Sequence, residues 1–452
     1  MKKYKLLIRF LRFSIIGFVN TVLHILIFNF LLTHGIHYLI SQTCGFIIVN
    51  IITFACNKYW TFGNSNPRIG YQLLLNYFGR SVTLSFTLIL TYILVEKLSI
   101  APIISQVYVV ILNVAFNFTI SQIFIFQPVP KDKLLYLAMS REAFENYNAT
   151  EKITIYFIVP VFKEHHRMYP GSETNPNGED FINVKIRQIR ELMKWNPMFS
   201  WKLIFIDDND KKYKSGKLIE VYTGQKYAEL LKQGYIHIWY LDEIDRDIAG
   251  VSRKGGAVIT ALKKIPEIGA KPHDIAVYTD ADISSDLRLT GSLIAPLLAG
   301  SNVAISSRWH EESTVVNRGV KEKLSSWVYN LIIYMLIRLD YTDTQNGFKA
   351  FKVCDINKLL PYASEYNFAF DTELLMLSEI FGFRITEVPI FWEDSSRETN
   401  VNLFRDTFQM LVALKKQRAK KKELLKSAFP VQEFGNNFRD LQIMHDSSAL
   451  TK

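Results

Sequence analysis

Cysteine is scarce throughout this chain, and acidic residues are scarce in its first quarter. Only three of 452 residues are cysteines, which argues against a disulfide scaffold, and we expect Cys44, Cys56 and Cys354 to be free thiols. Residues 1–126 carry nine Lys or Arg but one Asp or Glu, whereas the remaining 326 residues carry 44 against 42. Most of the net charge of +10 therefore flanks long apolar runs, which argues against nucleic-acid binding. The 49% hydrophobic content argues against a disordered chain.

Charged side chains are absent from Phe13 to Asn57. Because about 20 apolar residues span a bilayer, this stretch predicts two membrane helices joined by a turn at His34-Gly35-Ile36-His37. Two more apolar runs follow, on either side of Pro102. An apolar run of this length is too long for the hydrophobic region of a cleaved signal peptide. The sequence predicts an all-α domain with four spans, near residues 11–32, 38–57, 77–96 and 103–125.

The basic residues around these spans are unevenly distributed. They precede the first span, lie between the second and third, and follow the fourth, whereas the two other loops contain only Lys97. The positive-inside rule then places both termini, and everything after the fourth span, in the cytoplasm. We expect an integral protein of the cytoplasmic membrane.

The two halves of this domain look repeated. Ile40-Ser41-Gln42 recurs as Ile104-Ser105-Gln106, at an offset of 64 residues. Amides inside a membrane are costly unless bonded, so they indicate either helix–helix contacts or a polar pathway, and both interpretations stay open. The amides concerned are Asn50, Asn57, Asn113 and Asn117.

Several short motifs in this domain belong together. They are Gly17-Phe18-Val19-Asn20-Thr21, Asn57-Lys58-Tyr59-Trp60-Thr61-Phe62, Arg80, Asn113 and Asn117-Phe118. With them, residues 8–126 resemble the GtrA-like family of four-helix membrane proteins. Members of that family are associated with moving or handling polyprenyl-linked sugars, so the resemblance implies a role beside such lipids.

After a linker predicted at 127–150, apolar runs of strand length alternate with helical patterns. This order predicts βαβ units and a mostly parallel sheet. Ligands of open α/β sheets bind beyond the carboxyl ends of the strands, and several of these runs end in polar residues. The clearest strands are predicted at 153–160, 201–208, 235–241, 274–280 and 302–307.

Asp280 and Asp282 form the most informative of these strand ends. Two carboxylates two residues apart can hold one Mg²⁺ or Mn²⁺ ion together with substrate phosphates, although a solvated turn is the alternative. Lys254-Gly255-Gly256 begins a helical pattern about 25 residues earlier. Such a helix start can approach a diphosphate closely, or it can be an ordinary capped loop.

Further motifs follow in a set order: Arg308, then Asp343-Thr344-Gln345-Asn346-Gly347-Phe348-Lys349, then Phe370-Asp371-Thr372-Glu373, then Arg397. With the paired acids, they resemble glycosyltransferase family 2, and most of all the dolichyl-phosphate β-glucosyltransferases. The resemblance covers about residues 151–405. It implies a GT-A (Rossmann-like) α/β fold for a catalytic domain at 151–400.

The resemblance also implies roles for individual residues. Pro160, Glu164 and Asp208, preceded by Asp207, match positions that hold the nucleoside. Asp280 and Asp282 match the acids that bind the metal and the diphosphate, and Lys254 matches a basic residue beside the nucleotide. Arg308 and Arg397 match arginines near the acceptor and donor phosphates. Gln345 and Asp371 match positions at the sugar side of the cleft.

The C-terminal segment has a different composition. Residues 401–429 read as a basic amphipathic helix, which suggests docking on anionic lipid headgroups, with a solvated basic helix as the alternative. Residues 430–452 show no period and are predicted to be loosely ordered.

Together these patterns predict a membrane-anchored inverting glycosyltransferase. It would transfer a sugar, with UDP-glucose favoured as the donor, to a polyprenyl phosphate at the cytoplasmic face for cell-envelope glycan or glycolipid synthesis. A non-catalytic flippase or scaffold for lipid-linked sugars is the first alternative. A processive polysaccharide synthase is the second, although Ile305 stands where such enzymes carry Gln before Arg-Trp. Homo-oligomerisation stays open.

Overall fold

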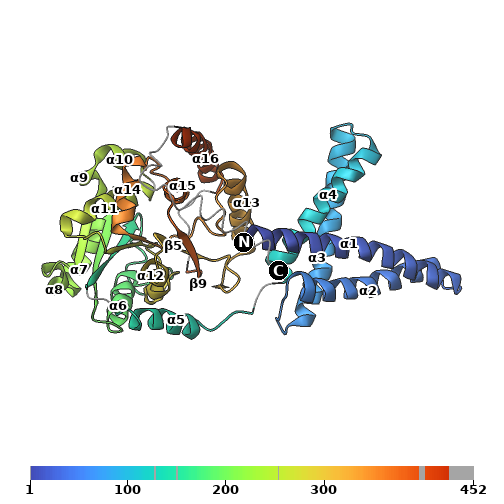
Figure 1. Cartoon of the computed structure of the whole chain (residues 1–452), viewed down its shortest axis with the longest axis horizontal. Coiled ribbons are helices and arrows are strands. Elements are labelled where there is room, and N and C mark those ends of the chain that lie inside the picture. The colour runs from blue at the N-terminus through green and yellow to red at the C-terminus, as the bar shows by residue number, and fades with distance from the viewer. Residues whose placement is uncertain (1, 127–128, 149–150, 253, 396–402, 427–452) are drawn as a thin grey trace, which may run out of the picture. The chain divides into compact units, whose positions relative to one another are not determined.

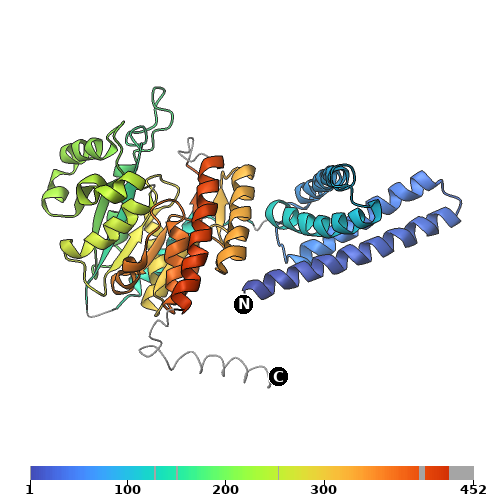
Figure 2. The ribbon, with the colours of Figure 1, turned by 90° about the horizontal axis from the view of Figure 1, so that it is seen from above.

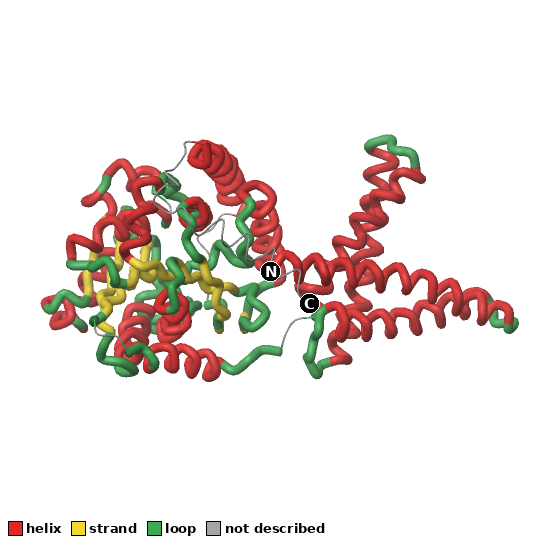
Figure 3. The backbone as a smooth tube through the Cα atoms, viewed as in Figure 1, coloured by secondary structure: helices red, strands yellow, loops and turns green. Residues whose placement is uncertain are grey.

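The computed structural model describes residues 2–126, 129–148, 151–252, 254–395 and 403–426 (Figure 1). The chain divides into two compact units, Met1–Pro130 and Lys131–Lys452. Each unit has its own architecture, which Figure 3 separates by element type. Helices and the loops between them make up the first unit, and all strands of the described residues lie in the second.

The N-terminal unit consists of four α-helices, three of which continue into a short π-helical segment. Pairs of helices are joined by tight turns, and Gly35 takes the positive φ of 79° that the first turn requires. The third helix begins eight residues before the predicted span at 77–96, and the other helices begin at or before their predicted spans. The bounds are α1 Lys2–Thr33, α2 Tyr38–Cys56, η1 Asn57–Thr61, α3 Ile69–Tyr92, η2 Ile93–Lys97, α4 Pro102–Ile120 and η3 Ser121–Ile125.

The surface of this unit is strongly apolar. Phe18, Leu74 and Phe78 are each at least 66% exposed, and many other large apolar side chains also point outward. Within the described residues, two helices are long and apolar enough to cross a membrane, Ile8–Thr33 and Ile69–Lys97. Exposed apolar area on this scale is what a lipid solvent requires and water disfavours.

The predicted internal repeat is confirmed. The π-helical segments η1 and η3 end the two helical hairpins and are separated by 64 residues. Ser41 and Ser105, also 64 apart, are both fully buried, and each hydroxyl donates to a carbonyl five residues earlier at 3.2 Å. The two hairpins therefore share local structure as well as sequence.

The second unit is built on a seven-stranded sheet in the order β3-β2-β1-β4-β7-β5-β8. β7 is antiparallel to both of its neighbours, and the other pairs are parallel, so the predicted mostly parallel α/β sheet is confirmed. A separate two-stranded sheet pairs β6 with β9. The bounds are β1 Ile153–Val161, β2 Phe199–Asp207, β3 Ile236–Tyr240, β4 Ile275–Tyr278, β5 Val303–Ser307, β6 Thr314–Val316, β7 Lys349–Lys352, β8 Ile385–Pro389 and β9 Phe391–Glu393.

Helices cover both faces of the sheet (Figure 2). Alternate residues of β1 supply the two cores: Ile155 and Phe157 pack on one side, Tyr156 and Ile158 on the other. One core involves α5, α6, α7 and α12, and the other involves α9, α10, α11, α13, α14, α15 and α16. The bounds are α5 Lys133–Glu145, α6 Phe181–Met193, α7 Ser215–Lys226, α8 Ala228–Lys232, α9 Leu241–Ile244, α10 Arg246–Val251, α11 Gly255–Lys264, η4 Ile265–Ile268, η5 Leu287–Leu289, α12 Thr290–Leu298, α13 Val320–Ile337, α14 Val353–Leu359, η6 Leu360–Tyr362, α15 Phe370–Ile380 and α16 Leu403–Lys426.

The linker predicted at 127–150 needs correction. Its helix, α5, is part of the α/β unit because Tyr136, Ser140 and Phe144 are buried there. Gly291 of α12 lies so close to Ser140 that a Cβ at position 291 would come within 2.0 Å of the Ser140 carbonyl oxygen. Helix α5 therefore extends the core of the second unit.

The basic helix predicted at 401–429 is observed as α16, and one side of it packs on the α/β unit. Leu414 is fully buried in the core, and the Lys420 ammonium pairs with the buried Glu373 carboxylate at 2.7 Å. Membrane docking stays a prediction for the exposed basic residues of this helix. The tail predicted at 430–452 lies outside the described residues.

Candidate active site

The polar residues singled out in the second unit gather at one edge of the sheet. β1, β2, β4 and β5 all run in the same direction, so their carboxyl ends meet at this edge. Pro160 lies next to the end of β1, opposite Ile206 of β2. The antiparallel β7 places its first residue, Lys349, at the same edge.

Lys254 connects two of these strand ends, those of β2 and β4. Its backbone N–H donates to Asp208 Oδ2 at 2.6 Å, and its ammonium lies 2.5 Å from Asp280 Oδ1. The backbone takes a positive φ of 68°, which directs both groups toward the site just before α11 begins. Gly256 donates its N–H to the Tyr366 carbonyl at 2.9 Å, so at least this amide of the predicted diphosphate-binding helix start bonds within the protein.

Asp280 and Asp282 sit side by side beyond β4. Burial favours the neutral form of both, but Lys254 outweighs it at Asp280 and lowers the pKa of that carboxyl. Burial and the Asp280 charge raise the pKa of Asp282. The fully buried Lys185 of α6 donates to the Asp282 carbonyl at 2.8 Å, which fixes the backbone directly after the second acid.

This pair suits a divalent cation that keeps open coordination positions. Carboxylate oxygens are hard ligands, and the two like charges destabilise each other until a cation lies between them. Among the described residues, no group of three or more His, Cys, Asp or Glu is arranged to hold a metal. Asp280 and Asp282 would therefore supply two carboxylates and leave the remaining positions to substrate phosphates.

Gly347 explains why a glycine stands in the motif before β7. A Cβ at this position would lie 2.2 Å from Asp280 Oδ2, a distance that no side chain can tolerate. The loop that carries Gln345 and Asn346 can therefore approach the Asp280 carboxylate only because residue 347 has no side chain.

Glu164 lies beside the paired acids, after β1. Its side chain is 12% exposed, and one oxygen lies 3.5 Å from the Arg167 guanidinium. Burial, followed by the charges of Asp282, Glu179 and Asp280, raises the pKa of Glu164 to about 7, although Arg167 opposes the shift. A carboxyl of this kind can donate or accept a hydrogen bond near neutral pH.

Asp207 supports the loop after β2. Its Oδ1 accepts the Asp210 N–H at 2.7 Å and its Oδ2 accepts the Gly216 N–H at 2.5 Å. Both carboxylate oxygens therefore already bond to the main chain, and a direct nucleotide contact by Asp207 stays a prediction. Asp208, the next residue, is the one that reaches Lys254.

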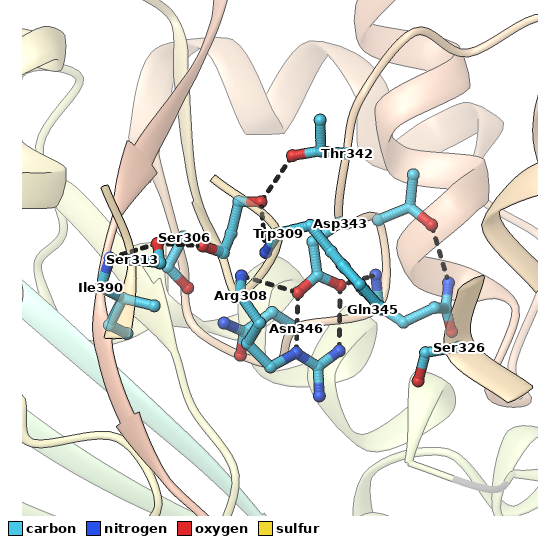
Figure 4. A network of polar contacts seen from close by, with 12 residues as sticks. Ser306, Arg308, Trp309, Ser313, Ser326, Thr342, Asp343, Gln345, Asn346 and Ile390 are labelled. Carbon is cyan, nitrogen blue, oxygen red and sulfur yellow. Dashed lines mark hydrogen bonds and ion pairs between the residues drawn. The ribbon is translucent and has the colours of Figure 1, made fainter. Parts of the chain in front are cut away.

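Arg308 is clamped by the aspartate that opens the Asp343–Lys349 motif. Its Nε and Nη2 lie 2.7 and 2.9 Å from the two oxygens of the fully buried Asp343, as Figure 4 shows. The same guanidinium lies 5.4 Å from the centre of the Trp392 ring. This bidentate pair and ring contact fix Arg308 at the end of β5.

Gln345 lies close to Asp371 through a contact with the next residue of α15. Gln345 donates to the Thr372 hydroxyl at 3.0 Å, next to Asp371 in α15. Asp371 is 2% exposed and accepts hydrogen bonds from Tyr278 and from the fully buried Lys349. Its carboxylate thus holds β4, β7 and α15 together, and contact with a sugar stays a prediction.

Two cations, the half-buried Arg318 and the fully buried Lys185, were missed by the sequence reasoning. Arg318 lies over the rings of Trp309 and Trp392 at 5.5 and 5.9 Å, and burial together with the Arg308 charge lowers its pKa to about 10. Neither has a local motif: Arg318 follows the short β6, and Lys185 lies within an amphipathic helix. Arg397 falls outside the described residues.

The comparisons with known proteins agree with this division of the chain. Residues 12–126 match the family model described as GtrA/DPMS, transmembrane domain. The N-terminal unit is therefore a membrane domain of this type, and the protein is a membrane protein. The region that matches this family model covers about a quarter of the sequence.

Three curated relatives are named glycosyltransferases. Glycosyltransferase AglD of Haloferax volcanii is 32% identical over 158 residues, which are 35% of this chain and 24% of that protein. UDP-N-acetylglucosamine–dolichyl-phosphate N-acetylglucosaminyltransferase of Methanococcus voltae is 31% identical over 36% of this chain and 65% of its own length. Dolichyl-phosphate beta-glucosyltransferase of Saccharomyces cerevisiae is 23% identical over 43% of this chain and 57% of its own length. The chain thus spans less than two thirds of each of these three relatives.

Proposed function

We propose that this protein is a membrane-anchored inverting glycosyltransferase with a GT-A catalytic domain. It transfers a sugar, with glucose favoured, from a nucleoside diphosphate sugar such as UDP-glucose to a polyprenyl phosphate. The observation that carries the proposal is an acidic pair and two partly buried arginines near the same edge of the sheet. Asp280 and Asp282 follow β4, and Arg308 follows β5 near enough to help lower the pKa of Asp280. Arg318, which follows β6, lies near enough to Arg308 for their charges to interact.

The arginines suit the acceptor. A lipid phosphate monoester already carries about −1.5 to −2 charges near pH 7, so its oxygen can attack without a dedicated general base. The phosphate oxygen forms a bond to the anomeric carbon of the sugar, and the bond from that carbon to the diphosphate breaks. Arg308, held by Asp343, and Arg318, held over two tryptophan rings, provide a fixed positive field for the incoming phosphate.

The acidic edge suits the donor. Asp280 and Asp282 would hold Mg²⁺ or Mn²⁺, which supplies charge stabilisation for the leaving diphosphate. Lys254 lies beside Asp280 and adds a second positive charge near that position. Glu164 and Asp208, on the neighbouring strand ends, are the proposed contacts for the nucleoside.

The names of the relatives support a polyprenyl phosphate acceptor, but they do not agree on which sugar is transferred. Two of the three act, by name, on dolichyl phosphate, but one transfers glucose and the other N-acetylglucosamine. The motif order favours glucose. The four helices of the N-terminal unit serve as four spans in this proposal, with the catalytic unit and both termini on the cytoplasmic side.

A non-catalytic flippase or scaffold is the competing proposal. It would need no acidic pair placed for a metal, whereas both acids are present beside Lys254. The decisive experiment incubates the purified full chain with polyprenyl phosphate, Mg²⁺ or Mn²⁺, and in turn UDP-glucose, UDP-N-acetylglucosamine or GDP-mannose. A lipid-linked sugar that is absent with Asp282→Asn supports the enzyme. Binding of nucleotide sugar without product from any donor would favour the scaffold.

A further inference from the structure

A polar cavity lies inside the apolar N-terminal unit. Its volume is about 250 Å³, and all four helices contribute to its wall. The wall includes an arginine and several asparagines: Asn20, Asn57, Asn76, Arg80, Asn113 and Asn117. So many polar side chains around one space contrast with the apolar outer surface of the same helices.

Arg80 is the unusual member of this wall. It lies within Ile69–Lys97, one of the two helices long and apolar enough to span a membrane. The only acidic residue of the unit, Glu96, is sixteen residues further along, which is roughly 24 Å on an α-helix. Among the described residues, no carboxylate forms an ion pair with Arg80. A cation at membrane depth without an anion is costly, so we expect Arg80 to bind an anion from outside the chain.

Asn76 is a second, independent indication that this cavity binds a ligand. It is 8% exposed, and its side-chain nitrogen has no hydrogen-bond acceptor among the described residues. Asn76 precedes Arg80 by four residues on α3, so the two side chains share one face of the helix. The Arg80 guanidinium and the Asn76 amide nitrogen both donate hydrogen bonds, and an anion accepts them.

Two other amides of the wall bond within the protein, whereas Asn113 Oδ1 has no donor among the described residues. Asn20 accepts from Thr53 at 2.8 Å, and Asn117 accepts from Thr83 at 2.7 Å. Both hydrogen bonds join neighbouring helices, so these two asparagines serve as helix–helix contacts. They fix the helices around the cavity and leave Asn76 and Arg80 as donors toward its interior.

We propose that this cavity binds the phosphate headgroup of a polyprenyl lipid through Arg80 and Asn76. A volume of about 250 Å³ is below the roughly 300–1,000 Å³ of clefts for drug-sized ligands, so it admits a headgroup but no prenyl tail. The tail would lie along the exposed apolar helices. This is a second phosphate site, separate from the one at Arg308, and only the choice of a polyprenyl lipid rests on the proposed function.

The test measures lipid binding to the full chain in detergent, so it does not depend on turnover. Native mass spectrometry compares a polyprenyl phosphate with the matching uncharged polyprenol, and inorganic phosphate is added as a competitor. The proteins are the wild type, Arg80→Gln, Asn76→Asp and Arg308→Gln. Arg68→Gln is the matched control, because Arg68 is an exposed arginine just before the same helix.

The wild type should prefer polyprenyl phosphate over polyprenol by about tenfold or more, as expected for one or two charge-assisted hydrogen bonds. Arg308→Gln and Arg68→Gln should keep at least part of this preference. Combined with Arg308→Gln, which removes the proposed catalytic phosphate site, Arg80→Gln and Asn76→Asp should lose most of it while still binding polyprenol, which also shows that they are folded. Asn76→Asp keeps the side-chain size and adds a charge that repels phosphate.

Two results would overturn the proposal. In the first, the preference survives Arg80→Gln and Asn76→Asp but disappears in Arg308→Gln, so that only the catalytic unit recognises the phosphate. In the second, millimolar inorganic phosphate displaces the lipid from the Arg308→Gln protein, so that the cavity takes a soluble anion. No glycosyltransferase activity in the wild type, with the preference retained in Arg308→Gln, would leave this site standing and count only against the proposed function.

Discussion

Asp282 and Asp280 lie so close at the end of β4 that their charges repel each other, and burial adds to the cost at Asp282. Replacing Asp282 with Asn removes one charge and keeps the shape. We expect turnover to fall by several orders of magnitude, while the melting temperature stays nearly unchanged or rises. Product formation and thermal unfolding of the purified variant are the two measurements, and excess chelator should abolish wild-type turnover. Normal turnover with chelator present would rule out a metal at this pair.

Glu164 gives a prediction about pH. Its pKa is about 7 in the folded protein and near 4.5 when unfolded, so its carboxyl must stay protonated on folding between these values. Stability is therefore fully present below pH 4.5 and is lost as the pH rises through 7, by up to about 3 kcal/mol. Glu164→Gln avoids this loss.

The check is thermal unfolding with chelator from pH 4.5 to 8.5. Glu164→Gln should melt above the wild type at pH 8.5 and close to it at pH 4.5. Glu267→Gln, at a side chain that is 67% exposed, should behave as the wild type at every pH. A gap between Glu164→Gln and the wild type that does not change with pH would contradict the pKa shift.

Arg308 tests the role of the guanidinium fork. Arg308→Lys keeps the charge but cannot contact both oxygens of Asp343, so the ammonium should no longer be held at the end of β5. We expect a higher KM for polyprenyl phosphate or a lower kcat, with little change in nucleotide-sugar binding. Arg288→Lys is the matched control, since Arg288 bonds both oxygens of Asp286 away from the site. If the two variants have the same kinetics, Arg308 does not contact the acceptor.

At the scale of elements, the loop before β7 decides how closely Asp280 is approached. Gly347→Ala would place a Cβ 2.2 Å from the Asp280 carboxylate, so that the loop or the acid must move. We expect kcat to fall by at least tenfold, with α/β secondary structure retained by circular dichroism. In Gly224→Ala, a Cβ meets open space within α7, so this control should keep full activity. Unchanged kcat in Gly347→Ala would show that this contact does not matter to the reaction.

At the scale of the whole molecule, the charge distribution predicts a topology. His34 is exposed in the turn between α1 and α2, and Ser65 is exposed in the loop before α3. In a protein whose native cysteines are replaced, His34→Cys should react with an impermeant thiol reagent from outside intact cells, whereas Ser65→Cys should react only after lysis. The opposite labelling pattern would place the catalytic unit outside the cell.

The sequence by itself determined the elements whose signal is local. The helices of the membrane unit follow from apolar length, and the five predicted strands follow from continuous apolar runs buried on both faces. The 64-residue repeat and the acids Asp280 and Asp282 after β4 could also be read directly, because each depends on neighbours in the chain. β7 was missed, since its four residues have no period of their own and pair only with β4 and β5.

Only the tertiary structure decided which polar residues are free to act. Asp207 and Asp371 carry the same carboxylate as Asp282, yet main-chain amides bond the first, and Lys349 and Tyr278 bond the second. Arg318 reaches Trp392 from a distant part of the chain. Such contacts depend on which strand ends and helices meet, and residues far apart in sequence meet only when the sheet has formed. The chemistry of a side chain can therefore be inferred from its residue type. Whether that side chain is free to bind a ligand depends on the contacts that it makes in the folded protein.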